Sequence, residues 1–329
     1  MGEVPENGNL LEQSGRNPSD IINIENFPGV TKALSRKYCC CNKYQVNSLS
    51  IFLEHWKVDL TMPLLVGIIF LFSYIVIVWG SFTLVSLLES ILSTIIFLIF
   101  MILFFIPYFL VIIEGPGYFP FYWSLSEADK NQLPGEENPI AGVVSNEDQY
   151  QWVQIQPRPP RSAFFRSAQR YVLQPDHLCG WCASWIGKRN VKFFMLFNLY
   201  GSIYTLLYAI WSIRIIIPCF SNVNFPICFF FVIIMLVVAI AFCSMMVSFL
   251  IPTIYNSSQN RTRWEMWNQI PPNAFRKETC RENMDEFCGN GPLWRWACPV
   301  LPFPGKSTEE LAEGYQTYDS IDVYDENNN

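Results

Sequence analysis

Charged residues are scarce in this chain of 329 residues. Asp, Glu, Lys and Arg make up 15% of it, whereas 51% of the residues are hydrophobic and 16% are aromatic. A soluble domain ordinarily carries about 25% charged residues, so the composition argues against a soluble enzyme. Because the formal net charge is -6, no nucleic-acid partner is expected. Histidine occurs only twice, which limits the choice of catalytic bases and metal ligands.

Acidic residues are absent from four long apolar runs. The runs cover approximately residues 62–82, 91–113, 193–217 and 227–251, and Arg214 is the one charged residue within them. About 20 apolar residues span the ~30 Å hydrocarbon core of a bilayer. The sequence therefore predicts an α-helical integral membrane protein with four transmembrane helices. Nothing before the first run resembles a cleavable signal peptide, so the N-terminus is expected to be retained.

Lysine and arginine are distributed unevenly around these runs. Six lie before the first run, eight between the second and third, and seven after the fourth, whereas the short links at residues 80–90 and 218–226 carry none. Because positively charged flanks stay in the cytosol, both termini and the long central loop are predicted to be cytosolic. The endoplasmic reticulum or the Golgi is the favoured membrane, with the plasma membrane as an alternative.

The polar segments complete the predicted domain organisation. Asn, Glu, Ser, Pro and Gly dominate the start of the chain, and an acidic stretch with three tyrosines ends it; such compositions favour disorder. The predicted regions are a largely disordered cytosolic N-terminal region (1–58), transmembrane helices 1 and 2 (59–113), a small cytosolic loop domain (114–192), transmembrane helices 3 and 4 (193–252) and a cytosolic C-terminal region with an acidic disordered tail (253–329). The adjacent thiols of Cys39, Cys40 and Cys41 can be S-acylated.

Four residues capable of chemistry, Asp176, His177, Cys179 and Cys182, lie within seven positions of the loop domain. Histidine with nearby cysteines is typical of zinc sites, but a structural zinc needs four ligands, commonly from two separated pairs. The Cys-x-x-Cys spacing occurs in thiol oxidoreductases, but there it belongs to a βαβ domain, which this Pro-broken loop does not suggest. In a third interpretation, His177 deprotonates a nucleophilic Cys179 while Asp176 orients the imidazole. The local spacing alone leaves these alternatives open.

The loop domain also reverses the charge of the chain locally. Residues 157–192 contain seven basic residues and one acidic residue, Asp176. A basic segment beside a bilayer can bind anionic lipid headgroups, and arginine also suits the phosphates of a ligand. The candidates for phosphate contacts are Arg158, Arg161, Lys188, Arg189 and Lys192.

Several short motifs surround the segment that contains Asp176, His177 and Cys179. PRPPRS at 157–162, DHLCGW at 176–181 and IGKRN at 186–190, followed by KFF, resemble the cysteine-rich domain of DHHC-type protein S-acyltransferases, the palmitoyltransferases. The Pro-Gly-Tyr after the second run, the Thr-Arg-Trp-Glu at 262–265 and Asn283 with Phe-Cys-Gly at 287–289 are similar to further motifs of that family. They occur in the family's order around the four apolar runs.

The resemblance implies a cytosolic catalytic domain between transmembrane helices 2 and 3. It implies that Cys179 is the nucleophile, that His177 is the base and that Asp176 orients it. Palmitoyl-CoA is then the expected acyl donor, and the acceptors are cytosolic or membrane proteins with juxtamembrane cysteines. The candidates to line an acyl cavity are Trp181, Gly201, Ser202 and Tyr204, and the expected supporting residues are Asn190, Thr262, Glu265 and Asn283.

The chain departs from the family at its zinc positions. The family holds two structural zinc ions through eight Cys and His residues. In the register of the resemblance, those positions hold Gln151, Gln154, Phe164, Phe165, Ala168, Tyr171, Leu178 and Trp185. None of these side chains is a usual zinc ligand, so zinc is predicted to be absent. Hydrophobic packing is expected to replace its structural role.

Two other functions remain open at this stage. The chain could be a catalytically inactive membrane scaffold related to the acyltransferases, or a membrane thiol oxidoreductase that uses Cys179 and Cys182. The loss of all eight metal positions, with Asp176, His177 and Cys179 retained, favours an active S-acyltransferase.

Overall fold

The computed structural model describes residues 44–46, 49–52, 56–57, 61–119, 157–165, 167–168, 170–222 and 226–321. The chain forms two compact units. The helical unit contains residues 58–117 and 175–306, and the hairpin unit contains residues 1–57, 118–174 and 307–329. The predicted catalytic loop domain, 114–192, is thus divided between the two units. Most of the N-terminal region that is predicted to be largely disordered, 1–58, lies outside the described residues.

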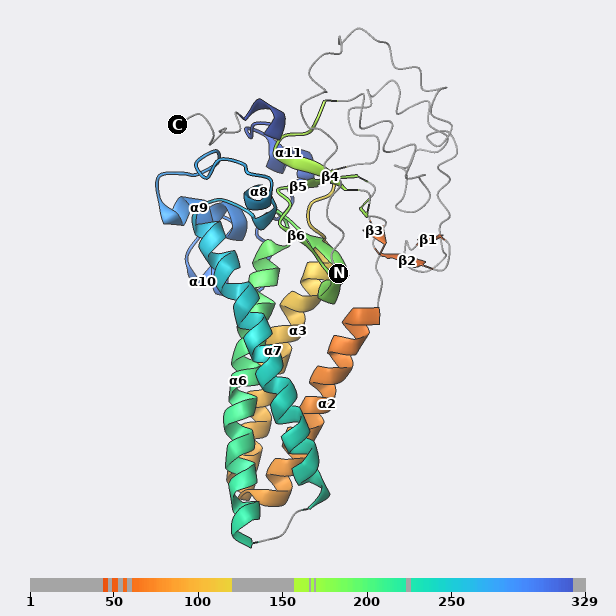
Figure 1. The fold of residues 1–329 in the computed structure, drawn as a ribbon, viewed down its shortest axis with the longest axis vertical. Helices are drawn as coiled ribbons and strands as arrows, with labels where there is room; N and C mark the ends of the chain where they lie inside the picture. The colour runs from red at the N-terminus through yellow and green to blue at the C-terminus, as the bar shows by residue number, and fades with distance from the viewer. Residues whose placement is uncertain are drawn as a thin grey trace. The chain divides into compact units, whose positions relative to one another are not determined.

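Four long helices form the body of the helical unit (Figure 1). They are α2 (Thr61–Leu84), α3 (Leu87–Glu114), α6 (Val191–Asn222) and α7 (Ile227–Ser258). Each is long and apolar enough to cross a membrane. This finding confirms the four helices predicted from the apolar runs, with ends that differ by a few residues.

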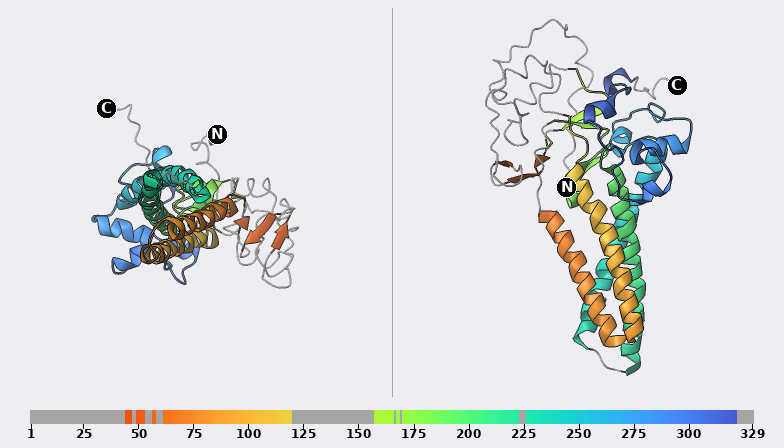
Figure 2. Two further views of the ribbon diagram at one scale, coloured as in Figure 1. Left: turned by 90° about the horizontal axis from the view of Figure 1, so that it is seen from below. Right: turned by 180° about the vertical axis from the view of Figure 1, so that it is seen from behind.

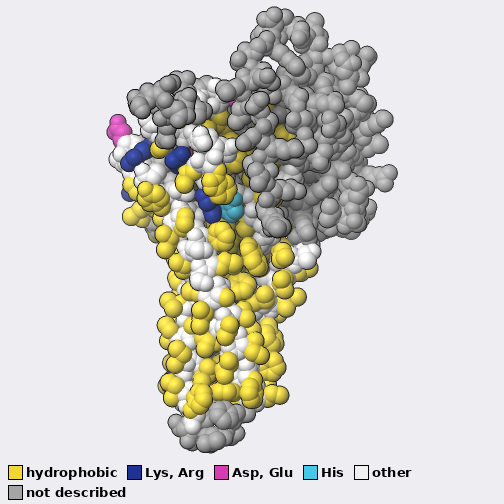
Figure 3. All heavy atoms as spheres, in the orientation of Figure 1, with side chains coloured by type: hydrophobic (Ala, Val, Ile, Leu, Met, Phe, Trp, Pro, Cys, Tyr) yellow, Lys and Arg dark blue, Asp and Glu magenta, His cyan; other side chains and the backbone are white. Residues whose placement is uncertain are grey.

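Helix α6 has the most interior position of the four. It packs extensively against α3 and α7, and the helices lie side by side in the views of Figure 2. Within its candidate span, 61% of the residues are buried, compared with 28% to 33% in the other three helices. On the face of the molecule shown in Figure 3, hydrophobic side chains cover the helices over most of their length, and many large hydrophobic side chains of the four long helices are exposed. Such a surface suits a lipid environment.

Local signals in the sequence set the ends of these helices. Ser86 caps α3, because its side chain accepts the backbone N–H of Glu89 and donates to the Glu89 carboxylate at 2.7 Å. Gly115 ends α3 with a φ of 63°, a conformation that glycine adopts readily. At the opposite end of the helices, Arg214 pairs with Glu89 at 3.2 Å.

The candidate catalytic residues lie on a short β-hairpin. This β-hairpin belongs to the helical unit and not to the hairpin unit. Strand β6 (His177–Cys179) pairs antiparallel with β7 (Ser184–Ile186), and the 3-10 helix η2 (Gly180–Cys182) connects them. Helix η2 contacts α2 and α3. Tyr108 of α3 donates a hydrogen bond of 2.7 Å to the carbonyl oxygen of Trp181, which fixes η2 against the bundle.

Three short helices follow α7 in the helical unit: α8 (Arg263–Trp267), α9 (Cys280–Cys288) and α10 (Trp294–Ala297). A capping box begins α8 and another begins α9. Helix α9 packs against α6 and α7. The segment after α7 is therefore folded back onto the same end of the bundle that carries the β-hairpin.

The hairpin unit contains small antiparallel sheets. Strand β4 (Ser162–Phe165) pairs with β5 (Arg170–Leu173). A second sheet contains β1 (Tyr44–Val46), β2 (Leu49–Phe52) and β3 (Trp56–Lys57). Within this unit the backbone N–H of Phe119 donates to the Tyr171 carbonyl oxygen at 3.0 Å.

The acidic tail differs from its prediction. Helix α11 (Thr308–Ala312) and the 3-10 helix η3 (Tyr318–Ser320) lie within it. A capping box begins α11, and the side chains of Leu311 and Tyr318 are buried. The prediction of disorder is therefore wrong for residues 307–321. The acidic composition suggested a solvated segment, but a few apolar side chains of the tail are buried against other residues. Residues 322–329 lie outside the described residues.

Candidate active site

Asp176, His177 and Cys179 are brought together at the start of the β-hairpin. His177 Nδ1 lies 2.7 Å from Asp176 Oδ2. Since an ionised carboxylate only accepts hydrogen bonds, Nδ1 carries the proton and donates it. The other ring nitrogen, Nε2, is buried and makes no hydrogen bond of ordinary geometry. The imidazole is therefore oriented by Asp176, and Nε2 is left available for proton transfer.

Arg263 is a member of this site that the sequence analysis did not predict. Its backbone N–H and its Nε donate to the two carboxylate oxygens of Asp176, at 2.8 and 2.9 Å. The guanidinium also faces the rings of Phe194 and Phe249, with its Cζ 5.6 and 5.5 Å from their centroids. A cation in the first turn of a helix interacts unfavourably with the helix dipole. The position of Arg263 at the start of a helix was therefore a signal that a specific anionic partner compensates for this cost.

The contacts of Asp176 and His177 shift the pKa values of both side chains. Burial would raise the pKa of the Asp176 carboxyl, but the hydrogen bond from His177 and the charges of His177 and Arg263 lower it to about 2. Burial opposes a charge on His177, yet its interactions with Asp176 and Cys179 raise the pKa of the imidazole above its ordinary value. Arg263 acts against this rise, because its Nη2 lies 3.1 Å from Nδ1.

The thiols of Cys179 and Cys182 lie 3.7 Å apart. The hydrogen bond from Cys182 lowers the pKa of the Cys179 thiol well below its ordinary value; burial opposes this shift, and His177 supports it. Burial raises the pKa of Cys182, and the neighbouring Cys179 raises it further. Cys179 is thus disposed to be the thiolate and Cys182 the neutral thiol, which is the electrostatic condition for a nucleophilic cysteine.

Cys179 opens onto an apolar pocket within the helical unit, which we call the upper pocket. The space between its lining side chains, including the part that is open to the outside, is about 370 Å³. Its walls combine aromatic and aliphatic side chains of all four long helices with Cys179 and Trp181. The lining residues are Val66, Phe104, Tyr108, Cys179, Trp181, Phe194, Phe197, Asn198, Phe242, Met245, Met246 and Phe249. The geometry thus supports the prediction that Trp181 borders an apolar cavity.

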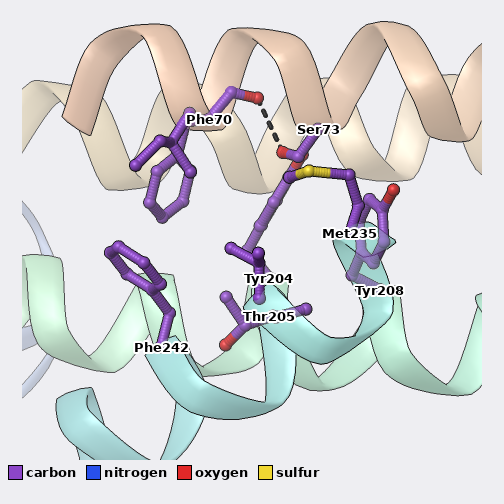
Figure 4. Close-up of a pocket in the computed structure, with 10 residues that line it drawn as sticks. Phe70, Ser73, Tyr204, Thr205, Tyr208, Met235 and Phe242 are labelled. Atoms are coloured by element: carbon purple, nitrogen blue, oxygen red, sulfur yellow. Dashed lines mark hydrogen bonds between the residues drawn. The ribbon is translucent and has the colours of Figure 1, made fainter. Parts of the chain in front are cut away.

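A second pocket, the lower pocket, lies deeper among the helices (Figure 4), and its empty space, including the part that is open to the outside, is about 250 Å³. Tyr204, a predicted cavity residue, lines it and shares a hydrogen bond of 2.7 Å with Ser73. Phe242 lines both pockets. The ring of Phe70, from the lower pocket, stacks at 3.9 Å on that of Phe104, from the upper pocket. Aromatic rings therefore separate the two spaces.

The other two predicted cavity residues lie outside both pockets. A Cβ atom on Gly201 would lie 2.5 Å from Met246 Sδ and 3.0 Å from Phe104, so this glycine permits close packing of α6 against its neighbours. Ser202 donates to the Leu199 carbonyl oxygen of its own helix at 2.8 Å. Neither residue lines a pocket directly, and their contacts are those of small residues that serve close packing in membrane helices.

The predicted phosphate contacts are also revised. Lys188 is 2% exposed and pairs with Glu286 at 2.6 Å, and Lys192 is 1% exposed and donates to the Val300 carbonyl oxygen. Both ammonium groups thus have internal partners, and the prediction that they bind phosphates is not compatible with this geometry. Arg189 is partly exposed but pairs with Glu114 at 3.2 Å.

Arg158 and Arg161 belong to the hairpin unit. Arg158 pairs with Asp319 at 3.2 Å. Arg161 is fully buried, with its guanidinium 5.2 Å from the ring centroid of Tyr315. Partners from the tail thus engage both arginines.

The four predicted supporting residues hold the site in place from a distance. Asn190 accepts from the Gly187 backbone and donates to the carbonyl oxygens of Val111 and Trp185. Thr262 and Glu265 form the capping box that fixes Arg263 at the start of α8. Asn283 joins α9 to Ser258, the last residue of α7, at 3.0 Å.

The residues at the expected zinc positions do not fit a metal ion. Gln151 and Gln154 lie outside the described residues, and the other six are Phe164, Phe165, Ala168, Tyr171, Leu178 and Trp185. None of the six offers the Cys, His or carboxylate ligands that zinc requires. Phe164 and Tyr171 instead form a cross-strand pair with ring centroids 5.8 Å apart. Within the described part of the chain, His, Cys, Asp and Glu form no group of three or more suited to a metal.

Comparison with known proteins agrees with this arrangement. Residues 144–270 match the DHHC palmitoyltransferase family. The chain is 26% identical over 201 residues to probable protein S-acyltransferase 13 of Arabidopsis thaliana, covering 58% of this chain and 66% of that protein. It is 40% identical over 65 residues to probable protein S-acyltransferase 12 of the same plant, covering 20% and 22%. It is 42% identical over 48 residues to palmitoyltransferase pfa3 of Emericella nidulans, covering 15% and 9%.

The chain thus spans less than two thirds of the length of each of these relatives. The matched segment 144–270 contains the β-hairpin with Cys179, the helices α6 and α7 that line the pockets, and Arg263 of α8. The chain carries a DHHC palmitoyltransferase domain and is homologous to plant protein S-acyltransferases.

Proposed function

We propose that the chain is a protein S-acyltransferase that moves a long-chain acyl group from acyl-CoA, through a thioester on Cys179, to a cysteine of a protein substrate. The single observation that carries this proposal is the position of Cys179. Its thiol combines a lowered pKa with an adjacent His177 and a place on the wall of an apolar pocket. A nucleophile with these neighbours suits an acyl donor whose tail is apolar.

The first half-reaction forms the acyl-enzyme. The Cys179 thiolate attacks the thioester carbonyl carbon of acyl-CoA, and the bond between that carbon and the CoA sulfur breaks. The departing CoA thiolate takes the proton of the His177 imidazolium at Nε2. Asp176 keeps the second ring nitrogen protonated and stabilises the imidazolium, while Arg263 keeps the Asp176 carboxylate ionised.

The second half-reaction returns the enzyme to its starting state. The thiol of an acceptor cysteine gives its proton to the neutral Nε2 of His177 and attacks the acyl carbon. The bond to Cys179 breaks, and the thiolate and imidazolium are restored together. Since the same pair is regenerated, no further proton donor is needed.

The test of this proposal is to trap the acyl-enzyme. The purified chain is incubated with palmitoyl-CoA, digested with trypsin and analysed by mass spectrometry. Residues 171–188 contain Cys179 and Cys182 and no internal lysine or arginine, so one peptide reports the site. The expected result is a palmitoyl group on Cys179 that neutral hydroxylamine removes. An unmodified 171–188 peptide, with palmitate found only at Cys39 to Cys41, would contradict the proposal.

We further propose that the aromatic partition between the two pockets limits the length of the acyl chain. Replacing Phe242 with alanine joins the pockets and should favour longer chains. Each additional buried methylene contributes about 0.8 kcal/mol, so two methylenes change the preference by roughly 10-fold. The measurement is competition between C16 and C18 acyl-CoA, which differ by two methylenes, for formation of the acyl-enzyme. Phe230→Ala, an exposed position on the same helix, is the matched control and should leave the ratio unchanged.

The domain is proposed to fold without zinc. The cross-strand pair of Phe164 and Tyr171 supports this proposal, because it occupies two positions where zinc ligands are expected. Addition of a strong zinc chelator is expected to change neither the melting temperature nor the rate of acyl-enzyme formation. Tyr171→Ala should instead lower the stability by about 3 kcal/mol, the ordinary cost of truncating a buried aromatic residue. About two zinc ions per chain in purified protein would contradict the proposal.

We also propose an orientation of the protein in the membrane and the partners that it meets there. The four candidate spans support a multi-pass protein, and the lysine and arginine distribution supports cytosolic termini. The β-hairpin with Cys179 then lies at the cytosolic end of the helices, where acyl-CoA and juxtamembrane cysteines of substrate proteins meet. The endoplasmic reticulum or the Golgi is the proposed membrane.

A further inference from the structure

Cys182 has no part in the proposed transfer of an acyl group, yet its thiol lies in the active site. The two Sγ atoms of Cys179 and Cys182 are 3.7 Å apart. Cys182 is fully buried, whereas Cys179 is 6% exposed and lines the upper pocket. One thiol of the pair can therefore be reached from the pocket, and the other lies directly behind it.

The backbone explains why these two side chains meet. Cys179 is the N-cap of η2 and Cys182 is its last residue. Side chains three residues apart eclipse each other in a 3-10 helix, so the turn holds both sulfur atoms on one side. The hydrogen bond from Tyr108 to the Trp181 carbonyl oxygen anchors the same turn. Gly180 has open space where a Cβ would lie, which leaves room for a small adjustment of the turn.

The chemistry of the two thiols is unequal. The pKa of Cys179 lies well below its ordinary value, and that of Cys182 lies well above it. Oxidation-sensitive cysteines typically combine thiolate character and access with a neighbouring resolving thiol. Cys179 has the first two properties, and Cys182 stands in the position of the third.

We propose that Cys179 and Cys182 are a redox-sensitive pair, which a peroxide converts to a disulfide that removes the nucleophile of the active site. The chemical class of the oxidant is a small hydroperoxide, such as hydrogen peroxide. The modification is reversible, since dithiols reduce disulfides by exchange.

The reaction proceeds in two balanced steps. The Cys179 thiolate attacks one peroxide oxygen, the O–O bond breaks, and the departing hydroxide takes a proton to become water; Cys179 is now a sulfenic acid. The Cys182 sulfur then attacks the Cys179 sulfur, the S–O bond breaks, and the hydroxide leaves as water with the proton of Cys182. In sum, two thiols are oxidised, and one hydrogen peroxide molecule is reduced to two water molecules.

The loss of acyl transfer on oxidation rests on the proposed function, whereas formation of the disulfide does not. A palmitoyl group on Cys179 should also protect the pair, because the thioester occupies the sulfur that peroxide attacks. The mass of the 171–188 peptide therefore tests the inference separately from any activity.

The experiment uses the full chain in detergent or lipid nanodiscs, treated with hydrogen peroxide and then with iodoacetamide before trypsin digestion. The expected result is a 171–188 peptide about 2 Da lighter than the reduced, unalkylated form, since disulfide formation removes two hydrogens. Dithiothreitol before alkylation should restore two alkylated cysteines. A wild-type peptide with sulfinic acid on Cys179 and an alkylated Cys182 would overturn the proposal, as would two alkylated cysteines after peroxide treatment.

Two variants sharpen this result. In Cys182→Ser the lighter peptide should be lost, and Cys179 should instead accumulate sulfinic acid, because no resolving thiol remains. Cys288→Ser is the matched control, since Cys288 is buried in α9 and its pKa is raised to about 12; the lighter peptide should persist there unchanged. A peptide about 2 Da lighter in Cys182→Ser would contradict the assignment of Cys182.

Discussion

Replacing Cys179 with serine is expected to abolish acyl transfer to a protein substrate, with a loss of at least about 10³-fold. The serine hydroxyl keeps its proton in a site that ionises a thiol, so no comparable nucleophile forms. Replacing His177 with glutamine should cost about 10²- to 10⁴-fold, the usual contribution of a general base. The measurement is hydroxylamine-sensitive transfer of an alkynyl fatty acid from its CoA ester to an acceptor protein.

These two variants need a background free of other labelled thiols. Cys39, Cys40 and Cys41 are therefore replaced by serine in every sample. Cys288→Ser should retain the activity of this background, because Cys288 lies in α9 outside the pockets. Equal transfer by the Cys179→Ser variant and its background would refute the role of the thiol.

Replacing Arg263 with glutamine is expected to lower transfer by roughly 10- to 100-fold. The change removes a charge-assisted hydrogen bond to the buried Asp176, worth about 1.5 to 3 kcal/mol. It also removes the positive charge that lowers the pKa of His177. The imidazole pKa should therefore rise, and His177 should become neutral only at higher pH. Because the second half-reaction needs neutral His177, its rate should reach half of its maximum at a higher pH than in the wild-type chain.

Arg263→Lys distinguishes a role in charge from a role in folding. Lysine retains the positive charge but lacks the planar guanidinium group, which donates to Asp176 and packs against the aromatic rings. It should recover the pH midpoint of the wild-type chain and only part of the rate. A glutamine variant with an unchanged melting temperature and an unchanged pH profile would contradict the proposed positioning role of Arg263.

The catalytic core was largely predictable because its residues are close in sequence. His177 and Cys179 lie on the short strand β6, and Asp176 directly precedes it, so a contact between them requires no knowledge of the rest of the fold. The four helices were predictable for a similar reason, since hydropathy over about 20 residues reports a span without reference to any neighbour. In both cases the information is local.

The errors arose where function depends on distant partners. Lys188 and Lys192 were predicted to bind phosphates from their charge, but their partners Glu286 and Val300 are about a hundred residues away. Gly201 was predicted to line an acyl cavity, but it packs against Met246 of α7 and lies outside both pockets. A side chain's charge or size does not indicate which surface it will meet.

By itself, the sequence determined the membrane class, the number of spans and the candidate reactive segment, because hydrophobic length and short motifs are properties of contiguous residues. Only the tertiary structure determined that Arg263, 87 residues from Asp176, binds the Asp176 carboxylate of the proposed catalytic group. It also determined that aromatic rings from α2, α3 and α7 divide the apolar space below Cys179. Both features depend on contacts between residues that are distant in sequence, and such contacts form only when the helices pack against one another.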